Sequence, residues 1–251
     1  IDSLLPNQTY KLLAAIQQGN NASNELSLTT MDTTSHNFTW QTFEFGIQTN
    51  VSRLFDVAII NENDIWAVGE IYMNDSLGNP DPNAYNAVHW DGTNWEPRKI
   101  NMLSNCNPVT FPPLKSIWAY SGNNIVFTSG GSIGWSDGTT INLDCRVNPF
   151  LTGAINKILG NSSNGLYVVG GSGSIANYNG NGWIKLESGT NLFLTDIAVS
   201  SNNEIHICGL NMATVDGVII KSDNGTNFNT LVESDNIPPG QLFKPKLYGT
   251  I

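Results

Sequence analysis

The feature that most constrains the fold is a pattern that recurs about every 40 residues between positions 54 and 251. Each copy has a short apolar run that follows a tight polar turn. The spacing is 41 positions from Ile125 to Leu166 and 39 from Leu166 to Ile205. It is 60 from Ile65 to Ile125, because the first copy carries two additional loops. β-Branched and other apolar residues dominate these runs, which predicts buried strands at 65–69, 125–129, 166–170 and 205–209.

Each copy is long enough for four strands. One strand precedes the polar turn, and two more follow the apolar run, joined by a turn that contains Asp-Gly or Asn-Gly. The glycine of that pair supplies the positive φ that a tight hairpin needs. Four antiparallel strands in a unit of this length are typical of β-propeller blades. A solenoid or a stack of sandwiches would give a similar strand density, but the four-strand unit favours a propeller.

We therefore predict an all-β fold, a β-propeller of four-stranded antiparallel blades. About four blades are expected, followed by the start of a fifth in the segment KPKLYGTI. This sequence would then be a fragment, a partial propeller over 46–251 whose missing blades carry further residues. The predicted blades cover about 54–100, 114–147, 154–188 and 194–234, with the next starting at 241–251.

One turn resembles a known motif. The segment KSDNGTNF at 221–228 is close to an Asp-box, with Lys221 where that motif prefers serine, and the other copies keep its glycine and in places its aromatic residue, Trp95 or Trp183. The repeat resembles secreted bacterial β-propellers and is similar to the Asp-box and photosystem-assembly-factor-like propellers. In those families the Asp-box stabilises a turn at the blade periphery, so the resemblance implies a fold and no active site.

The first 30 residues do not follow the repeat. The residues Leu5, Pro6, Thr9 and Tyr10 resemble the strand-F entry and tyrosine corner of a fibronectin type III domain. The resemblance covers the last two strands of a domain that needs ~90–100 residues. An alternative is a β-hairpin that belongs to the propeller itself. Residues 31–45 would form a linker with aromatic residues that pack against the first blade, namely Trp40, Phe43 and Phe45.

Composition excludes several classes of partner. The chain has 11 Lys and Arg residues against 21 Asp and Glu, with a formal net charge of -10. A nucleic-acid-binding protein needs clustered cations for phosphate, whereas the 11 cationic residues of this chain are thinly spread. Membrane insertion is not expected, because no run of 18 apolar residues occurs. We expect an extracellular or cell-surface protein, exported by a signal that this chain does not contain.

Long loops indicate where binding would occur. In a propeller, the loops between the second and third strands share one face with the connections between blades. Three long segments fall on that face, at 70–86, 101–113 and 145–153. Long loops on a rigid scaffold commonly carry binding sites. The candidate ligand-binding residues are Glu70, Tyr72, Asp75, Asn79, Asp81, Tyr85 and Phe111.

Two interpretations of these loop residues stay open. Four side-chain oxygen donors within nine positions suit Ca²⁺, which takes oxygen ligands, but the same residue types favour an ordinary turn region. They are Asp75, Asn79, Asp81 and Asn83. No other cofactor is expected. The aromatic residues Tyr72, Tyr85 and Phe111 would either stack on a ligand or pin the loops to the blade.

The cysteine and histidine residues show no metal-site spacing. Cys106 and Cys145 lie in equivalent loops of neighbouring blades, so an exported protein could join them in a disulfide. Cys208 ends a predicted buried strand, which is typical of a small core residue. His89 and His206 lie within strands, where a structural role is the simpler interpretation.

The function that this architecture favours is non-catalytic binding of a polysaccharide or a surface protein. One alternative is a carbohydrate-active enzyme of the glycoside hydrolase type, with Glu70 and Asp81 as carboxylates, although their spacing does not pair them. Another is a purely structural module of a surface adhesin. A sialidase-like site needs an arginine cluster at the central face, and the chain has three arginines, Arg53, Arg98 and Arg146. Arg98 is expected in a fourth, outer strand and Arg146 just beyond one, so we do not expect them to converge at the axis.

Overall fold

The computed structural model describes residues 8–12, 26–29, 40–47, 51–161, 165–200, 202–214 and 217–233. The chain divides into two compact units, Ile1–Glu44 and Phe45–Ile251. In the first unit, β1 (Thr9–Leu12) pairs antiparallel with β2 (Leu26–Thr29), so that Tyr10 lies opposite Leu28. Leu5 and Pro6 lie outside the described residues, and the fibronectin interpretation stays a prediction.

The second unit contains four sheets of four antiparallel strands. Blades one and two consist of β3 (Arg53–Asn61), β4 (Asp64–Ile71), β5 (Tyr85–Trp90) and β6 (Trp95–Arg98), then β9 (Ser116–Ser121), β10 (Asn124–Ser129), β11 (Ser132–Ser136) and β12 (Ile141–Asp144). Blades three and four consist of β13 (Ile155–Asn161), β14 (Gly165–Gly170), β15 (Ser174–Tyr178) and β16 (Trp183–Glu187), then β17 (Phe193–Val199), β18 (Ile205–Leu210), β19 (Gly217–Ser222) and β20 (Asn229–Glu233).

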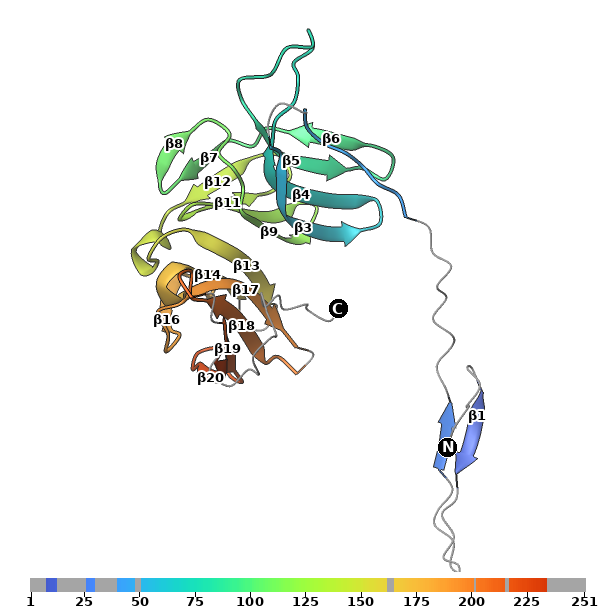
Figure 1. The fold of residues 1–251 in the computed structure, drawn as a ribbon, viewed down its shortest axis with the longest axis vertical. Helices are drawn as coiled ribbons and strands as arrows, with labels where there is room; N and C mark the ends of the chain where they lie inside the picture. Colours follow the sequence, from blue (N-terminus) through green and yellow to red (C-terminus); the bar gives the residue numbers. More distant parts are fainter. Residues whose placement is uncertain are drawn as a thin grey trace, which may run out of the picture. The chain divides into compact units, whose positions relative to one another are not determined.

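The sheets are the blades of a β-propeller, which confirms the predicted fold class. Within each blade the strands pair in sequence order. The first strands of successive blades contact one another, β3 with β9, β9 with β13 and β13 with β17, so they form the inner layer of the propeller (Figure 1). The predicted start of a fifth blade lies outside the described residues.

The blades bury their apolar residues against each other. The first-strand residues Ile117, Ile158 and Ile197 occupy equivalent positions in blades two, three and four, and their exposed fractions are 1%, 0% and 3%. Each belongs to the core cluster that its blade shares with the blade before it. At the same position in blade one, Val57 is 52% exposed. The core of this propeller is therefore a series of inter-blade layers, and one face of blade one contributes less to it.

A polar network links the inner strands of three blades. The Asp56 carboxylate of blade one accepts hydrogen bonds from the Ser116 hydroxyl (2.5 Å) and the Ile117 amide (3.0 Å) of blade two. It also pairs with the Lys157 ammonium of blade three at 2.5 Å. The Ser116 hydroxyl accepts from the Ile158 amide. Because these groups satisfy one another, the inner layer can bury them and still hold its register.

Each blade closes its last hairpin with the same turn. A side-chain oxygen at the first turn position accepts backbone amides two and three residues later, as an Asx turn does. These residues are Asp91, Asp137, Asn179 and Asn224. The glycine that follows each of them has a positive φ, as the Asp-Gly and Asn-Gly pairs predicted: Gly92, Gly138, Gly180 and Gly225.

The connection from blade one to blade two forms a hairpin of β7 (Met102–Ser104) and β8 (Asn107–Val109). This hairpin is fastened to blade two. Cys106 forms a disulfide with Cys145, with a Cα–Cα distance of 5.7 Å, and the Asn105 side chain accepts the Gly131 amide. The segment after Cys145 contains the 3-10 turn η1 (Asn148–Phe150).

In the described ranges, helices occur as 3-10 turns of three residues, η1 and η2 (Gly171–Gly173). None has the length and apolar character of a membrane span. Among the predicted linker contacts, the Phe45 ring packs edge-on against Trp95 of blade one, with centroids 5.7 Å apart. Trp40 and Phe43 belong to the first unit, so their predicted contacts with blade one stay untested.

Candidate binding cleft between blades one and two

The predicted loop residues hold one another in place. The Lys99 ammonium, just after β6, pairs with Asp81 at 2.5 Å and lies over the rings of Tyr85 and Phe111, 4.6 and 5.6 Å from their centroids. The hydrogen bond from Lys99 holds the pKa of Asp81 below its usual value. One lysine thus ties both long loops of blade one to the end of its outer strand.

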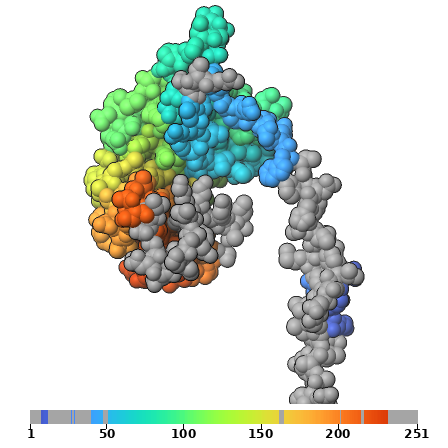
Figure 2. All heavy atoms as spheres, viewed as in Figure 1, coloured from blue at the N-terminus to red at the C-terminus, as the bar shows by residue number. Residues whose placement is uncertain are grey.

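The other loop candidates also bond within the loops. The Tyr72 hydroxyl donates to Glu70 at 2.6 Å, and this bond raises the pKa of Tyr72. The Asp75 carboxylate accepts the Leu77 and Asn79 amides, both at 2.9 Å, and the Asp81 carboxylate accepts the Asn83 amide. In Figure 2 the loop between β4 and β5 projects from the propeller unit.

The calcium hypothesis has no direct support from these contacts. Asp75 and Asp81 each accept backbone amides of their own loop, and within the described ranges no three His, Cys, Asp or Glu residues gather as a metal site would require. The contacts of this loop do not test whether the side chains of Asn79 and Asn83 bind calcium. A Ca²⁺ site at this loop stays a prediction.

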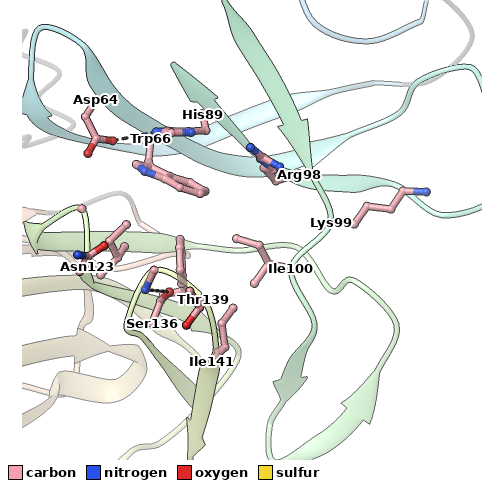
Figure 3. Close-up of a pocket in the computed structure, with 14 residues that line it drawn as sticks. Asp64, Trp66, His89, Arg98, Lys99, Ile100, Asn123, Ser136, Thr139 and Ile141 are labelled. Carbon is pink, nitrogen blue, oxygen red and sulfur yellow. Dashed lines mark hydrogen bonds and ion pairs between the residues drawn. The ribbon is translucent and has the colours of Figure 1, made fainter. Parts of the chain in front are cut away.

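A cleft of about 440 Å³ lies between blades one and two. Figure 3 shows Trp66 and His89 of blade one on one side and Ser136 and Thr139 of blade two on the other. Apolar side chains form its base, with polar groups at the rim, which is the usual build of a ligand pocket. The apolar residues are Trp66, Ile100, Ile125, Phe127 and Ile141, and the polar ones include Asp64, His89, Arg98, Asn123, Ser136 and Thr139.

Blade one contributes a stacked pair of rings to the lining of the cleft. The His89 ring lies on Trp66 with centroids 4.2 Å apart and planes 22° apart, and its Nε2 lies 2.9 Å from an Asp64 oxygen. Blade four has an ion pair at the equivalent positions, where Lys221 lies 2.6 Å from Glu204. A pair that joins the second and third strands is therefore present in blades one and four, and in blade one it also lines the cleft.

A buried amide fixes the end of the cleft. Asn86, which is fully buried in β5, donates to the carbonyls of Ile100 and Pro112 and accepts the Ile100 amide at 2.8 Å. These bonds hold the chain after β6 so that Ile100 reaches the apolar base of the cleft. Lys99, the preceding residue, also lines the cleft, and in Figure 3 its side chain extends away from the other labelled residues.

The first interface, between blades one and two, lacks aromatic residues that fill the second interface, between blades two and three. The cleft lies where these residues are missing. Between blades two and three, Trp135 lies 5.3 Å from Tyr178, which lies 5.3 Å from Trp183. The repeat places His89, Ser136 and Ile141, respectively, at these positions in the first interface. All three are smaller, and although Trp66 stands where blade two has Val126, it lines the hollow that they leave without filling it.

Sequence reasoning missed this site. It assigned His89 a structural role and placed binding on the long loops, whereas the cleft is lined by residues of the short turns, including Asn123 and Thr139. Arg98, expected in an outer strand, is at the end of β6 and lines the cleft while pairing with Glu96. Alignment of the repeats against each other would have shown the missing aromatic residues.

No family model matches the chain, and no curated protein matches it in sequence. Solved propellers are similar in fold. YCF48 bound to D1 peptide is 15% identical over 74% of this chain and 58% of that chain, with a TM-score of 0.49. A structural genomics protein of unknown function from Bacteroides thetaiotaomicron is 10% identical over 70% and 57%, with a TM-score of 0.42. YCF48 from Cyanidioschyzon merolae is 13% identical over 71% and 84%, with a TM-score of 0.39. The match spans less than two thirds of the first two chains.

Proposed function

We propose that this propeller is a non-catalytic binding protein that holds a segment of a protein partner in the cleft between blades one and two. The observation that carries the proposal is the cleft itself, about 440 Å³ with an apolar base and a polar rim. Ligand pockets are commonly clefts of this size, lined by apolar side chains with a few placed polar groups. A side chain of a partner would enter the hollow while its backbone meets the rim.

The loop residues support a binding role over a catalytic one. The carboxylates proposed for glycoside hydrolysis each have an internal partner, since Glu70 accepts the Tyr72 hydroxyl and Asp81 pairs with Lys99. The Cys106–Cys145 disulfide supports the expected location outside the cell, because disulfides persist in oxidising compartments.

The test is selection of peptides on the immobilised chain from a random display library, in parallel with a glycan array. The blocking variant is Thr139→Trp, which places a large side chain at the rim of the cleft. Its matched control is Thr93→Trp, the equivalent turn position of blade one, which does not line the cleft. We expect selected peptides to lose at least tenfold in affinity for Thr139→Trp and to bind Thr93→Trp normally.

Two results would overturn the proposal. Peptides that bind both variants equally would place the site elsewhere on the propeller. Glycan binding that Thr139→Trp abolishes, without any selected peptide, would replace the protein partner with a polysaccharide.

A further inference from the structure

We infer that the anchor group in this cleft is an aromatic side chain of the partner, which takes the place that Tyr178 occupies between blades two and three. The inference rests on the proposed function and narrows it to one chemical class of anchor. The packed interface between blades two and three shows which group fits this geometry between two blades.

The second interface provides the pattern. There Tyr178 of blade three lies between Trp135 of blade two and Trp183 of its own blade, with ring centroids 5.3 Å away on either side. The guanidinium of Arg146, which follows the outer strand of blade two, lies 6.0 Å from the Tyr178 ring. The ring thus has aromatic neighbours and a cation within the range of a cation–π contact.

The first interface offers the same kinds of contact without the ring. His89 takes the position of Trp135 and is held flat against Trp66, so an aromatic surface already faces the hollow. Arg98, at the end of the outer strand of blade one, lines the cleft as a cation. Ser136 stands where blade three has Tyr178, and its short side chain leaves the space for a ring.

The rim favours a ring over a sugar. A sugar needs several hydrogen-bonding groups directed at its hydroxyls, but two hydroxyls of this rim are engaged in their own turn. The Ser136 hydroxyl accepts the Gly138 amide, and the Thr139 hydroxyl donates to Asp137 at 2.8 Å. Three further polar side chains of the rim have partners within the chain, since Asp64 pairs with His89 and Arg98 pairs with Glu96. Trp, Tyr and Arg are the residues enriched where protein partners anchor to one another, which favours an aromatic anchor.

The experiment compares two blocked peptides, Ac-Gly-Gly-Tyr-Gly-Gly-NH₂ and Ac-Gly-Gly-Leu-Gly-Gly-NH₂, titrated into the ¹⁵N-labelled chain. We expect the tyrosine peptide to shift the Trp66 indole and the Asn123 and Thr139 amide signals in a saturable way. The leucine peptide should bind roughly three- to tenfold more weakly, because an aromatic pair adds to simple apolar burial. Equal affinities, or no saturable shift at these signals, would overturn the inference.

Filling the cleft provides the control. Ser136→Tyr restores the residue of blade three and should abolish the shifts, whereas Thr93→Trp, at the equivalent turn position of blade one outside the cleft, should preserve them. If Ser136→Tyr does not fold, Ile141→Trp fills the cleft from the neighbouring position that Trp183 occupies in blade three. Tyrosine binding that survives a folded filling variant would also overturn the inference. If the selected peptides bind in the cleft but contain no aromatic anchor, the proposed function holds and only the inference of an aromatic anchor is overturned.

Discussion

At the scale of single residues, the chain depends on short polar turns to separate its strands. Asp91 and Asp137 each hold two backbone amides, and these bonds hold the pKa values of both carboxyl groups below their usual range. In blades three and four, Asn179 and Asn224 accept the same amides without a charge. The turn therefore needs a side-chain oxygen but no charge. Where that oxygen belongs to an aspartate, the stability of the turn also depends on pH.

The prediction for Asp137 follows from the sign of its shift. A carboxyl group whose pKa is lower in the folded state stabilises the fold above its unfolded value, here 3.8, and that stabilisation is lost as the pH falls through the folded value. Asp137→Asn should thus flatten the decline of the unfolding midpoint below about pH 4, with little change at pH 7. Asp137→Ala should lower the midpoint at pH 7 as well. Thermal melts from pH 7 to pH 2 test both, and equal behaviour of the two variants would contradict the argument.

The turns and the apolar runs were predictable from sequence because their causes are local. A glycine with positive φ follows each Asx residue, and alternating apolar residues mark the strands. The cleft was not found, because it depends on which residues of different blades face each other. Taken alone, His89 and Ser136 are ordinary strand residues. They indicate a cleft only when they are compared with Trp135 and Tyr178, which occupy the equivalent positions in the interface between blades two and three.

At the scale of elements, the two long loops of blade one depend on Lys99. Its ammonium contacts Asp81 of the first loop and the Phe111 ring of the second. Lys99→Met should keep the alkyl packing but lose the ion pair and the cation–π contacts, so both loops should become more accessible to protease. Limited proteolysis with mass spectrometry would locate new cleavage sites within both loops, at 70–86 and 101–113. Lys185→Met is the control, because Lys185 forms an exposed pair with Glu187 in blade three. A cleavage pattern identical to that of the control would show that Lys99 does not tie the loops.

The strand β5 fixes one end of the cleft through Asn86. Asn86→Ala would leave the Ile100 and Pro112 carbonyls without their buried donor, and we expect a loss of about 1–3 kcal/mol in the free energy of unfolding. Because Ile100 would no longer be held, peptide binding in the cleft should weaken in the folded variant too. Chemical denaturation and peptide titration measure the two effects. If the variant is destabilised but binds the peptide normally, Asn86 does not set the geometry of the cleft.

At the scale of the whole molecule, the blades depend on one another for their cores. Trp118 of blade two lies so close to Gly160 of blade three that a Cβ there would come within 2.0 Å of its Nε1. The Asp56–Lys157 pair reaches from blade one to blade three across the inner strand of blade two. The contribution to the free energy of unfolding should therefore differ between the blade interfaces, and it should be larger where the apolar residues of the inner strand are more completely buried.

A pair of equivalent substitutions measures this difference. Ile158→Ala removes a fully buried side chain between blades two and three, where such a change costs about 2–5 kcal/mol. Val57→Ala changes the same position of blade one, but because Val57 is 52% exposed the cost should be about 0.5 kcal/mol or less. Denaturant unfolding of both variants at the same protein concentration gives the comparison. Equal costs would mean that in solution another surface covers the inner strand of blade one, and dependence of the Val57→Ala cost on protein concentration would identify that surface as a second copy of the chain.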